Sequence, residues 1–243
     1  MTPLVEALED HLNRQLERSR GFFWNRVRWE LVTAQLPGGR FELVDVGAGP
    51  GFLGDFLADR RPEIAYRFVE PIAGLERQLS DRFGADANRR DADLSGASVV
   101  TLLDVLEHQQ DDRAFLSELA EKMDPGATLL LTVPAMPSLW SNWDVSLGHY
   151  RRYTKASLAA AAEHTRFEIR ERAYLFPELI PLGWWRRLRE RGGEVPGGAG
   201  EAEFPDLPRP LNETLYRISS ASKATRRAWP AGTSLFAVLR RTA

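Results

Sequence analysis

The sequence predicts a doubly wound α/β fold built on a mostly parallel sheet of seven strands. Over residues 41–133, short apolar segments alternate with amphipathic helical segments, which is typical of a parallel sheet with helices on both faces. The first apolar segment ends in a glycine-rich turn that opens a helix. The segment 98–103 is apolar throughout and so predicts a strand that is buried on both faces.

Local signals place the individual elements. Strands are expected at 41–46, 65–69, 87–90, 98–103, 127–133, 167–175 and 234–240. Helices are expected at 3–20, 22–36, 52–60, 74–83, 111–122 and 157–164. Thr154 is the predicted N-cap of the last of these helices, since its hydroxyl can accept a hydrogen bond from a free N–H of the first turn. The strand at 87–90 has the weakest pattern, and the strand at 234–240 is expected to be antiparallel.

The segment between the last two predicted strands has a different character. It is about 58 residues long, which is too many for an ordinary loop. It contains helical patterns at 179–191 and 211–227 on either side of a glycine-rich break. We expect a cap or lid over 177–232, between an α/β domain at 41–176 and its final strand at 233–243, with N-terminal helices over 1–40.

Composition limits the classes of function. The chain has 243 residues, 32 Lys plus Arg and 34 Asp plus Glu, so its formal net charge is −2, which argues against a nucleic-acid partner. It has no cysteine, which excludes disulfides, zinc fingers and cysteine nucleophiles. No metal ligands are expected. The charged N-terminal residues and the lack of a long apolar run predict a cytoplasmic protein with no transmembrane segment.

The glycine-rich turn, residues 45–51, reads DVGAGPG. Gly47, Gly49 and Gly51 would let the backbone approach a ligand, and the following helix offers free N–H groups. The dinucleotide-binding fingerprint would require a further glycine where Phe52 stands. With Asp45 two residues before the first glycine, the turn instead resembles motif I of class I S-adenosylmethionine-dependent methyltransferases.

Two acids fit the same resemblance. Glu70 ends the second predicted strand, and an ionised carboxylate there can accept hydrogen bonds from both ribose hydroxyls. Asp91 stands where methyltransferases of this class place an acid that receives the adenine amino group. Asp93 is the alternative for that role.

Further segments resemble the methyltransferase family that includes the ubiquinone and menaquinone methylases. They are residues 103–108 (LDVLEH) and 123–126 (MDPG), and residues 23–28 (FWNRVR) loosely match a bacterial subgroup of that family. The resemblance implies S-adenosylmethionine as cofactor and S-adenosylhomocysteine as product. It implies cofactor contacts from Trp24, Arg28, Asp45, Gly47, Ala48, Gly49, Gly51, Phe52, Glu70, Pro71, Asp91, Ala92, Leu103, Asp104 and Val105. Glu107 and His108 are expected to hold their loop by hydrogen bonds, with a catalytic His108 as the alternative.

The loop after the fifth predicted strand carries DVSLGHYRRY at 144–153, similar to an element of that subgroup. Ligands of open α/β sheets bind at the carboxyl ends of the strands, where this loop begins. His149 is the first candidate for a general base, with Asp144 orienting its ring. Substrate contacts are expected from Trp140, Trp143, Tyr150, Arg151, Arg152 and Tyr153. The alternative is an internal network that only fixes the loop.

These features predict a methyltransferase that acts on a small molecule. O- or C-methylation of an apolar or anionic acceptor, resembling a natural product or a lipid, is the leading interpretation. An N-methyltransferase and a non-catalytic S-adenosylmethionine-binding protein remain as alternatives. Trp184 and Trp185 lie beside basic residues and could wall the substrate pocket, pack in the core or contact a membrane surface peripherally. The sequence does not predict the oligomeric state.

Overall fold

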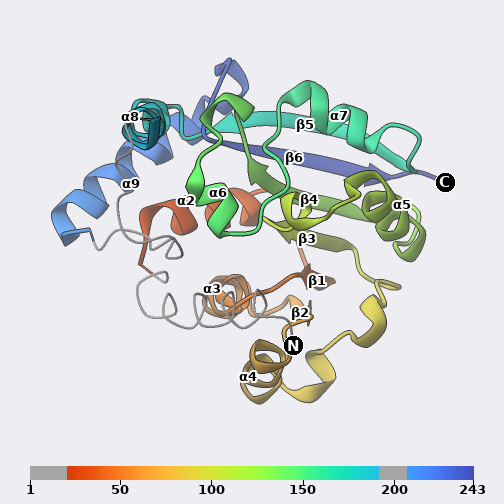
Figure 1. The fold of residues 1–243 in the computed structure, drawn as a ribbon. Helices are drawn as coiled ribbons and strands as arrows, with labels where there is room; N and C mark the ends of the chain where they lie inside the picture. Colours follow the sequence, from red (N-terminus) through yellow and green to blue (C-terminus); the bar gives the residue numbers. More distant parts are fainter. Residues whose placement is uncertain (1–20, 192–206) are drawn as a thin grey trace.

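The computed structural model describes residues 21–191 and 207–243 and contains one mixed sheet (Figure 1). Its strands are β1 (Glu42–Val46), β2 (Ala65–Val69), β3 (Val99–Leu103), β4 (Thr128–Pro134), β5 (Phe167–Leu175) and β6 (Ser234–Arg241). Their order is β2-β1-β3-β4-β6-β5. The first four strands are parallel, and β6 is antiparallel to both β4 and β5. The predicted α/β class and the antiparallel last strand are confirmed.

The helices follow the expected alternation with the strands. They are α2 (Phe23–Thr33), α3 (Phe52–Arg60), α4 (Ala73–Phe83), α5 (Asp112–Lys122), α6 (Asn142–Ser146), α7 (Lys155–Ala162), α8 (Ile180–Arg191) and α9 (Arg209–Ala224). The hydroxyl of Thr154 accepts a hydrogen bond from the N–H of Ser157, which confirms the predicted cap of α7. The helix expected at 3–20 and the glycine-rich break at 192–200 lie outside the described residues.

The predicted strand at 87–90 is wrong, and the described sheet has six strands rather than seven. A short 3-10 helix, η1 (Ala85–Ala87), stands there instead, and one bridge between Phe68 and Asn88 is all that remains of the pairing. The polar side chains of this segment bond to other segments: Asn88 donates to Glu76 of α4, and Arg89 pairs with Glu42 of β1. Only Ala87 offers an apolar side chain to the core, so little burial favours a full strand.

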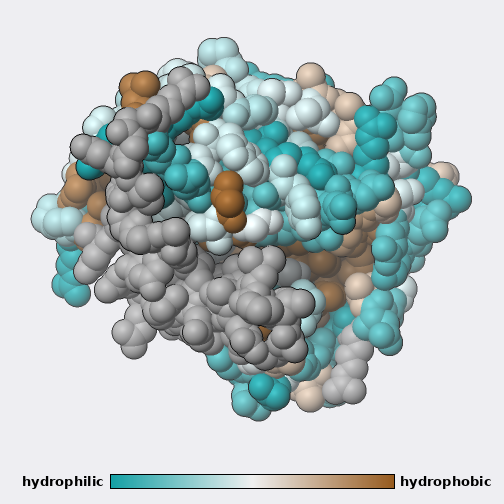
Figure 2. Space-filling model, in the orientation of Figure 1, coloured by the Kyte–Doolittle hydropathy of each residue, from teal (hydrophilic) through white to brown (hydrophobic). Residues whose placement is uncertain are grey.

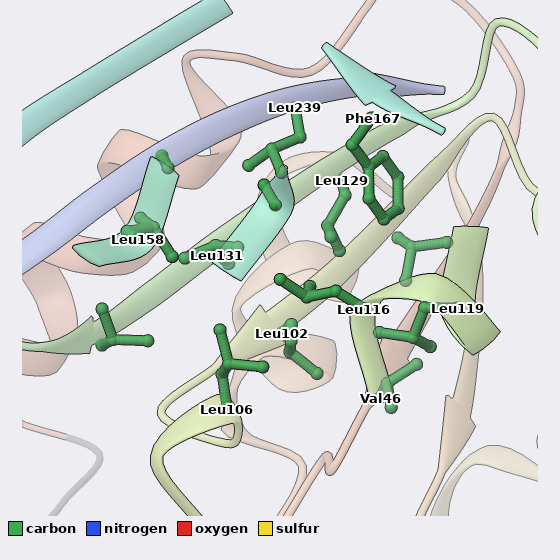
Figure 3. Packing of buried hydrophobic residues seen from close by; sticks show 14 of the residues in the cluster. Val46, Leu102, Leu106, Leu116, Leu119, Leu129, Leu131, Leu158, Phe167 and Leu239 are labelled. Carbon is green, nitrogen blue, oxygen red and sulfur yellow. The ribbon is translucent and has the colours of Figure 1, made fainter. Parts of the chain in front are cut away.

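Successive side chains of the central strands point to opposite faces of the sheet, and each face is buried in its own hydrophobic cluster. Leu129, Leu131 and Val133 of β4 pack toward α5 and α7, whereas Leu130 between them packs toward α2 and α3. Figure 3 shows the first of these clusters, in which Leu116 and Leu119 of α5 meet the strand side chains. The period of two residues is the expected one for strands covered on both faces.

The helices α2 and α9 pack together, although they are far apart in sequence. Arg26 of α2 pairs with Glu213 of α9 at 2.8 Å, and Glu30 of α2 accepts hydrogen bonds from Tyr216 at 2.6 Å and Lys223 at 2.7 Å. Figure 1 shows α8 and α9 gathered at the end of the sheet where α2 lies. These contacts attach the described part of the insert to the helix that also reaches the site below.

The face of the molecule in Figure 2 carries both polar and apolar residues. Trp184 and Trp185 of α8 are 39% and 53% exposed, so they are not part of the core. None of the helices within residues 21–191 and 207–243 is long and apolar enough to cross a membrane.

Candidate active site

A pocket of about 430 Å³ lies at the carboxyl ends of the parallel strands. Segments from α2, the glycine turn, the end of β2, the end of β3 and the loop after β4 all contribute to its walls. Fifteen of the predicted site residues line it: Trp24, Arg28, Asp45, Gly47, Ala48, Gly49, Phe52, Glu70, Pro71, Leu103, Asp104, Val105, Trp143, His149 and Arg152. The structure therefore joins the predicted cofactor segments and part of the predicted acceptor loop in one cavity.

The structure does not bring the other predicted residues to the wall of this pocket. They are Gly51, Asp91, Ala92, Trp140, Asp144, Tyr150, Arg151 and Tyr153. Asp91 is exposed, and its rival Asp93 pairs with Ser95 and Arg89. Trp184 and Trp185 do not line the pocket either.

Several of these residues hold the structure around the pocket. A Cβ on Gly51 would collide with Leu79, Arg82 and Phe83, so this glycine lets α4 pack against the turn. Tyr153 is buried and donates a hydrogen bond to Asp112 at 2.8 Å, and Arg151 pairs with the same carboxylate at 2.9 Å.

Gly49 and Glu70 form the floor of the pocket at the end of β1 and β2. The N–H of Gly49 donates to Oε2 of Glu70 at 2.7 Å, and the N–H of Ile72 donates to Oε1 at 2.9 Å. A Cβ built on Gly49, whose φ is +54°, would meet no atom within 4 Å, so the space above this residue is open. Each oxygen of Glu70 keeps a second lone pair for a ligand.

The environment of Glu70 disfavours its charge. Burial, aided by the negative charge of Asp45, raises its pKa to about 7, although the two backbone N–H donors work in the opposite direction. Glu70 is 9% exposed. A ligand that donates hydrogen bonds to this carboxylate would restore the stabilisation that water otherwise gives it.

Asp45 has an internal role in addition to lining the pocket. Its two oxygens accept hydrogen bonds from Thr101 at 2.6 Å and Tyr66 at 3.0 Å, which tie β1 to both neighbouring strands. Burial raises its pKa to about 6, and those hydrogen bonds oppose the rise. The predicted cofactor contact of Asp45 is therefore compatible with a carboxylate whose main partners are the strands.

Arg28 reaches from α2 to the ends of β3 and β4. It pairs with Oδ2 of Asp104 at 2.6 Å and donates to Oγ1 of Thr132 at 2.9 Å. Asp104 has a φ of +56°, unusual for a residue with a side chain, and its N–H donates to the carbonyl of Thr132. This turn directs the chain from β3 into the pocket wall, and Arg28 of α2 holds it there.

His149 and Asp144 form the pair that the sequence predicted. Nδ1 of His149 lies 3.0 Å from Oδ1 of Asp144, which also accepts a hydrogen bond from Nε of Arg152 at 2.7 Å. The other oxygen of Asp144 accepts from the N–H of Ser141 at 3.0 Å, within the capping box that starts α6. Asp144 is fully buried, so it supports the histidine from behind the pocket wall.

Charge and burial compete at Asp144. Burial acts to raise its pKa, but the hydrogen bond to His149 and the charge of Arg152 outweigh burial and leave the pKa below its ordinary value. The carboxylate is therefore ionised near pH 7 and fixes which ring nitrogen of His149 faces it.

Glu107 is a site residue that the sequence interpretation assigned only to loop structure. It lies in η3 (Leu106–His108), is fully buried and lines the pocket. Neither of its carboxylate oxygens has a hydrogen-bond partner among the described residues. Burial and the nearby charge of Asp104 raise its pKa well above the ordinary value. Its backbone carbonyl nevertheless accepts a hydrogen bond from the N–H of Tyr150 at 2.8 Å and so holds the loop that follows β4.

His108 lies next to His149 in the pocket wall. Their rings are edge to face with centroids 4.8 Å apart. Burial, followed by the effect of His149, lowers the pKa of His108 to about 4, so this ring is neutral near pH 7. The sequence signal for both Glu107 and His108 was the LDVLEH segment, but only the fold places them against the loop that follows β4.

Comparisons with known proteins agree with this architecture. Residues 6–172 match a family model described as a methyltransferase domain. Uncharacterised methyltransferases of Mycobacterium tuberculosis and Mycobacterium bovis are 31% identical over 126 residues, which is 48% of this chain. The chain spans 63% of the length of these curated relatives.

Solved structures share the fold at low sequence identity. The methyltransferase from the complex with the Haloferax volcanii Trm112 methyltransferase activator aligns with a TM-score of 0.63 and 14% identity, covering 100% of this chain and 99% of that chain. A geranyl diphosphate C-methyltransferase of Streptomyces coelicolor, solved with S-adenosylhomocysteine, aligns with a TM-score of 0.55 and 14% identity, covering 88% and 78%.

Proposed function

The chain belongs to the methyltransferase domain family, and from this premise we propose that it is an S-adenosylmethionine-dependent enzyme that methylates a small-molecule acceptor. The carrying observation is that one pocket joins the Gly49–Glu70 floor to the His149–Asp144 pair. S-adenosylmethionine supplies a methyl group on a sulfonium, which leaves as the thioether S-adenosylhomocysteine. The chain must then hold this donor and an acceptor in line.

The floor of the pocket suits the nucleoside end of the cofactor. The open space above Gly49 allows close approach to the backbone, and Glu70 can accept hydrogen bonds from two adjacent hydroxyls. Arg28 and Asp104 lie in the same pocket and carry the opposite charges that the carboxylate and amine of the methionine part require. The residues present therefore fit S-adenosylmethionine.

The acceptor would bind where His149, Trp143 and Arg152 line the pocket. Since Asp144 holds Nδ1 of His149, the lone pair of Nε2 is available to take a proton from an acceptor hydroxyl or carbon acid. Asp144 then stabilises the imidazolium that forms. Trp143 offers an apolar surface to the acceptor, and Arg152 offers positive charge for an anionic group.

Calorimetry tests the first half of the proposal. S-adenosylmethionine and S-adenosylhomocysteine should bind with a Kd on the order of micromolar, about −8 kcal/mol. Binding of NAD and not of S-adenosylmethionine would overturn it. The second half is tested by incubating the protein and methyl-labelled S-adenosylmethionine with panels of small hydroxylated, carbon-acid and amine acceptors. Label transfer to amines alone would replace base-assisted methylation with N-methylation, and cofactor binding without transfer to any panel would favour a non-catalytic protein.

A further inference from the structure

Glu107, His108 and His149 converge on one point of the pocket wall, and we propose that they bind a divalent transition-metal cation. One potential ligand atom from each residue lies within 4.8 Å of the others. All three residues line the pocket, so an ion held by them would face the bound acceptor. The binding site stands on this geometry alone, whereas its use in catalysis rests on the proposed function.

The state of Glu107 is the first independent argument. A fully buried carboxylate whose two oxygens lack partners is costly, and polar groups in this position generally have a ligand, an ion or water. Oε1 of Glu107 lies 4.0 Å from Nε2 of His149, too far for a hydrogen bond and close enough for two ligands of one ion. A cation would satisfy the carboxylate directly.

The arrangement behind His149 is the second argument. Metal-binding histidines usually donate their other ring N–H to a carboxylate, a backbone carbonyl or water, which fixes the tautomer and orients the ring. Asp144 occupies that position, 3.0 Å from Nδ1, and a proton on Nδ1 leaves a lone pair on Nε2, which lies 4.0 Å from Oε1 of Glu107. Asp144 is itself held by Arg152 and Ser141, so the supporting carboxylate is rigid.

Backbone contacts hold the two ligand-bearing segments together. The N–H of Tyr150 donates to the carbonyl of Glu107 at 2.8 Å, which joins the two segments. Within the second segment, the N–H of His149 donates to the carbonyl of Asp144 at 2.9 Å. With metal–ligand bonds of about 2.1 Å, neighbouring ligands of a tetrahedral ion are about 3.4 Å apart. The observed separations of up to 4.8 Å would have to shorten by about 1.4 Å for such an ion to bind.

The donor set selects the class of ion. Two imidazoles and one carboxylate suit zinc, iron, cobalt or manganese, whereas magnesium and calcium prefer oxygen ligands alone. Three protein ligands leave at least one open position, as in catalytic rather than structural sites.

An acceptor hydroxyl could occupy the open position. An ion held by these three residues would lower the pKa of that hydroxyl, so that its proton would pass to water; the oxygen would then bond to the methyl carbon of S-adenosylmethionine while the electron pair of the C–S bond would pass to sulfur, releasing S-adenosylhomocysteine. In this arrangement Nε2 of His149 binds the ion and does not take the proton itself. The ion then takes over the role of His149 in promoting loss of the proton from the acceptor.

Cobalt(II) is the probe for the test, because its visible absorption reports nitrogen ligands. The untagged full-length protein is stripped with a chelator and titrated, with zinc competition measured by calorimetry. We expect one equivalent to bind with micromolar or tighter affinity. Glu107→Gln, His108→Ala and His149→Ala should each weaken binding at least tenfold. His164→Ala removes an exposed histidine outside the cluster and should leave binding unchanged.

Circular dichroism of each variant shows whether it is folded. Absence of a stoichiometric cobalt spectrum in the wild-type protein, or equal binding by wild type and folded Glu107→Gln, would overturn the metal site. S-adenosylhomocysteine binding is measured on the same stripped protein. Its retention together with a failed cobalt titration would reject the ion and leave the proposed function intact, whereas the reverse result would reject the cofactor alone.

Discussion

His149 contacts Asp144 through Nδ1 at 3.0 Å, and this one contact sets the direction in which Nε2 points into the pocket. The same oxygen of Asp144, Oδ1, also accepts a hydrogen bond from Nε of Arg152, and Oδ2 accepts one from the N–H of Ser141 at the start of α6. The histidine is therefore at the end of the network and the carboxylate is at its centre. Substitutions at the two positions should consequently have different effects.

His149→Ala should lower turnover by roughly 10² to 10⁴, the usual contribution of a positioned acid–base group. S-adenosylmethionine affinity should change by less than a few fold, because the proposed cofactor contacts are elsewhere in the pocket. Turnover is measured on an acceptor identified with labelled cofactor, and affinity by calorimetry. Near-normal turnover in a folded variant would remove His149 from the chemistry, and a raised KM alone would indicate a role in binding the acceptor.

Asp144→Ala should instead lower the free energy of unfolding. It leaves the guanidinium of Arg152 without its partner, and breaking a buried ion pair from one side costs about 3 kcal/mol or more. The free energy of unfolding is measured by denaturant titration. Because the folded pKa of Asp144 lies below its ordinary value of 3.8, the stabilisation is present above that pH and is lost as the pH falls. The difference between wild type and variant should therefore shrink below about pH 4. A loss of stability equal to that of His149→Ala would contradict this role.

Elements with strong periodicity could be predicted from the sequence to within a residue or two. The bounds of β2, α3 and β5 agree with the predicted ones, because clear turn signals bound these segments. The strand at 87–90 failed because its polar side chains find partners in neighbouring segments, which a local pattern does not contain. The short α6 was not predicted, since five residues are too few to show a helical period.

The site likewise contains residues that could be predicted from the sequence and residues that could not. Gly49, Glu70 and the Asp144–His149 pair could be predicted because each follows a strand end in a spaced motif. Glu107 could not, since its significance depends on the absence of partners in a fully buried position. Tyr150 and Tyr153 belong to the same motif as His149, but the former is exposed and the latter is buried against Asp112. A motif therefore identified the loop, and only packing separates the side chains that face the pocket.

Two glycines of the same turn offer a matched pair of substitutions. Gly49→Leu places a side chain in the open space where the ligand is proposed to lie and should abolish cofactor binding. Gly51→Ala should instead lower the melting temperature, because its Cβ meets Leu79, Arg82 and Phe83. Overpacking of this kind costs about 1 to 3 kcal/mol. Calorimetry and thermal unfolding of both variants make the comparison, and weakened binding by a stable Gly51→Ala would reverse these assignments.

The ionisation of Glu70 links cofactor binding to pH. Its pKa of about 7 in the free protein means that the charged and neutral forms are comparably populated near neutrality. A raised folded pKa also means that this group contributes stability at acidic pH that is lost as the pH rises through about 7. A cofactor whose hydroxyls donate to the carboxylate selects the ionised form, because only that form offers both oxygens as acceptors.

Cofactor affinity should therefore rise with pH and level off above about pH 8. Apparent affinity scales with the fraction of protein in the binding form, so the Kd should be about tenfold weaker at pH 6 than at pH 8. Glu70→Gln keeps the shape of the side chain but cannot ionise, so its affinity should be lower by roughly 1.5 to 3 kcal/mol at pH 8 and should lack this pH dependence. Calorimetric titration of both proteins with S-adenosylmethionine between pH 6 and pH 8 makes the measurement. Since any titration of the ligand itself is common to both proteins, only the difference between them reports Glu70. The same slope in the variant as in the wild type would assign the pH dependence to another group and remove Glu70 as the acceptor of the hydroxyls.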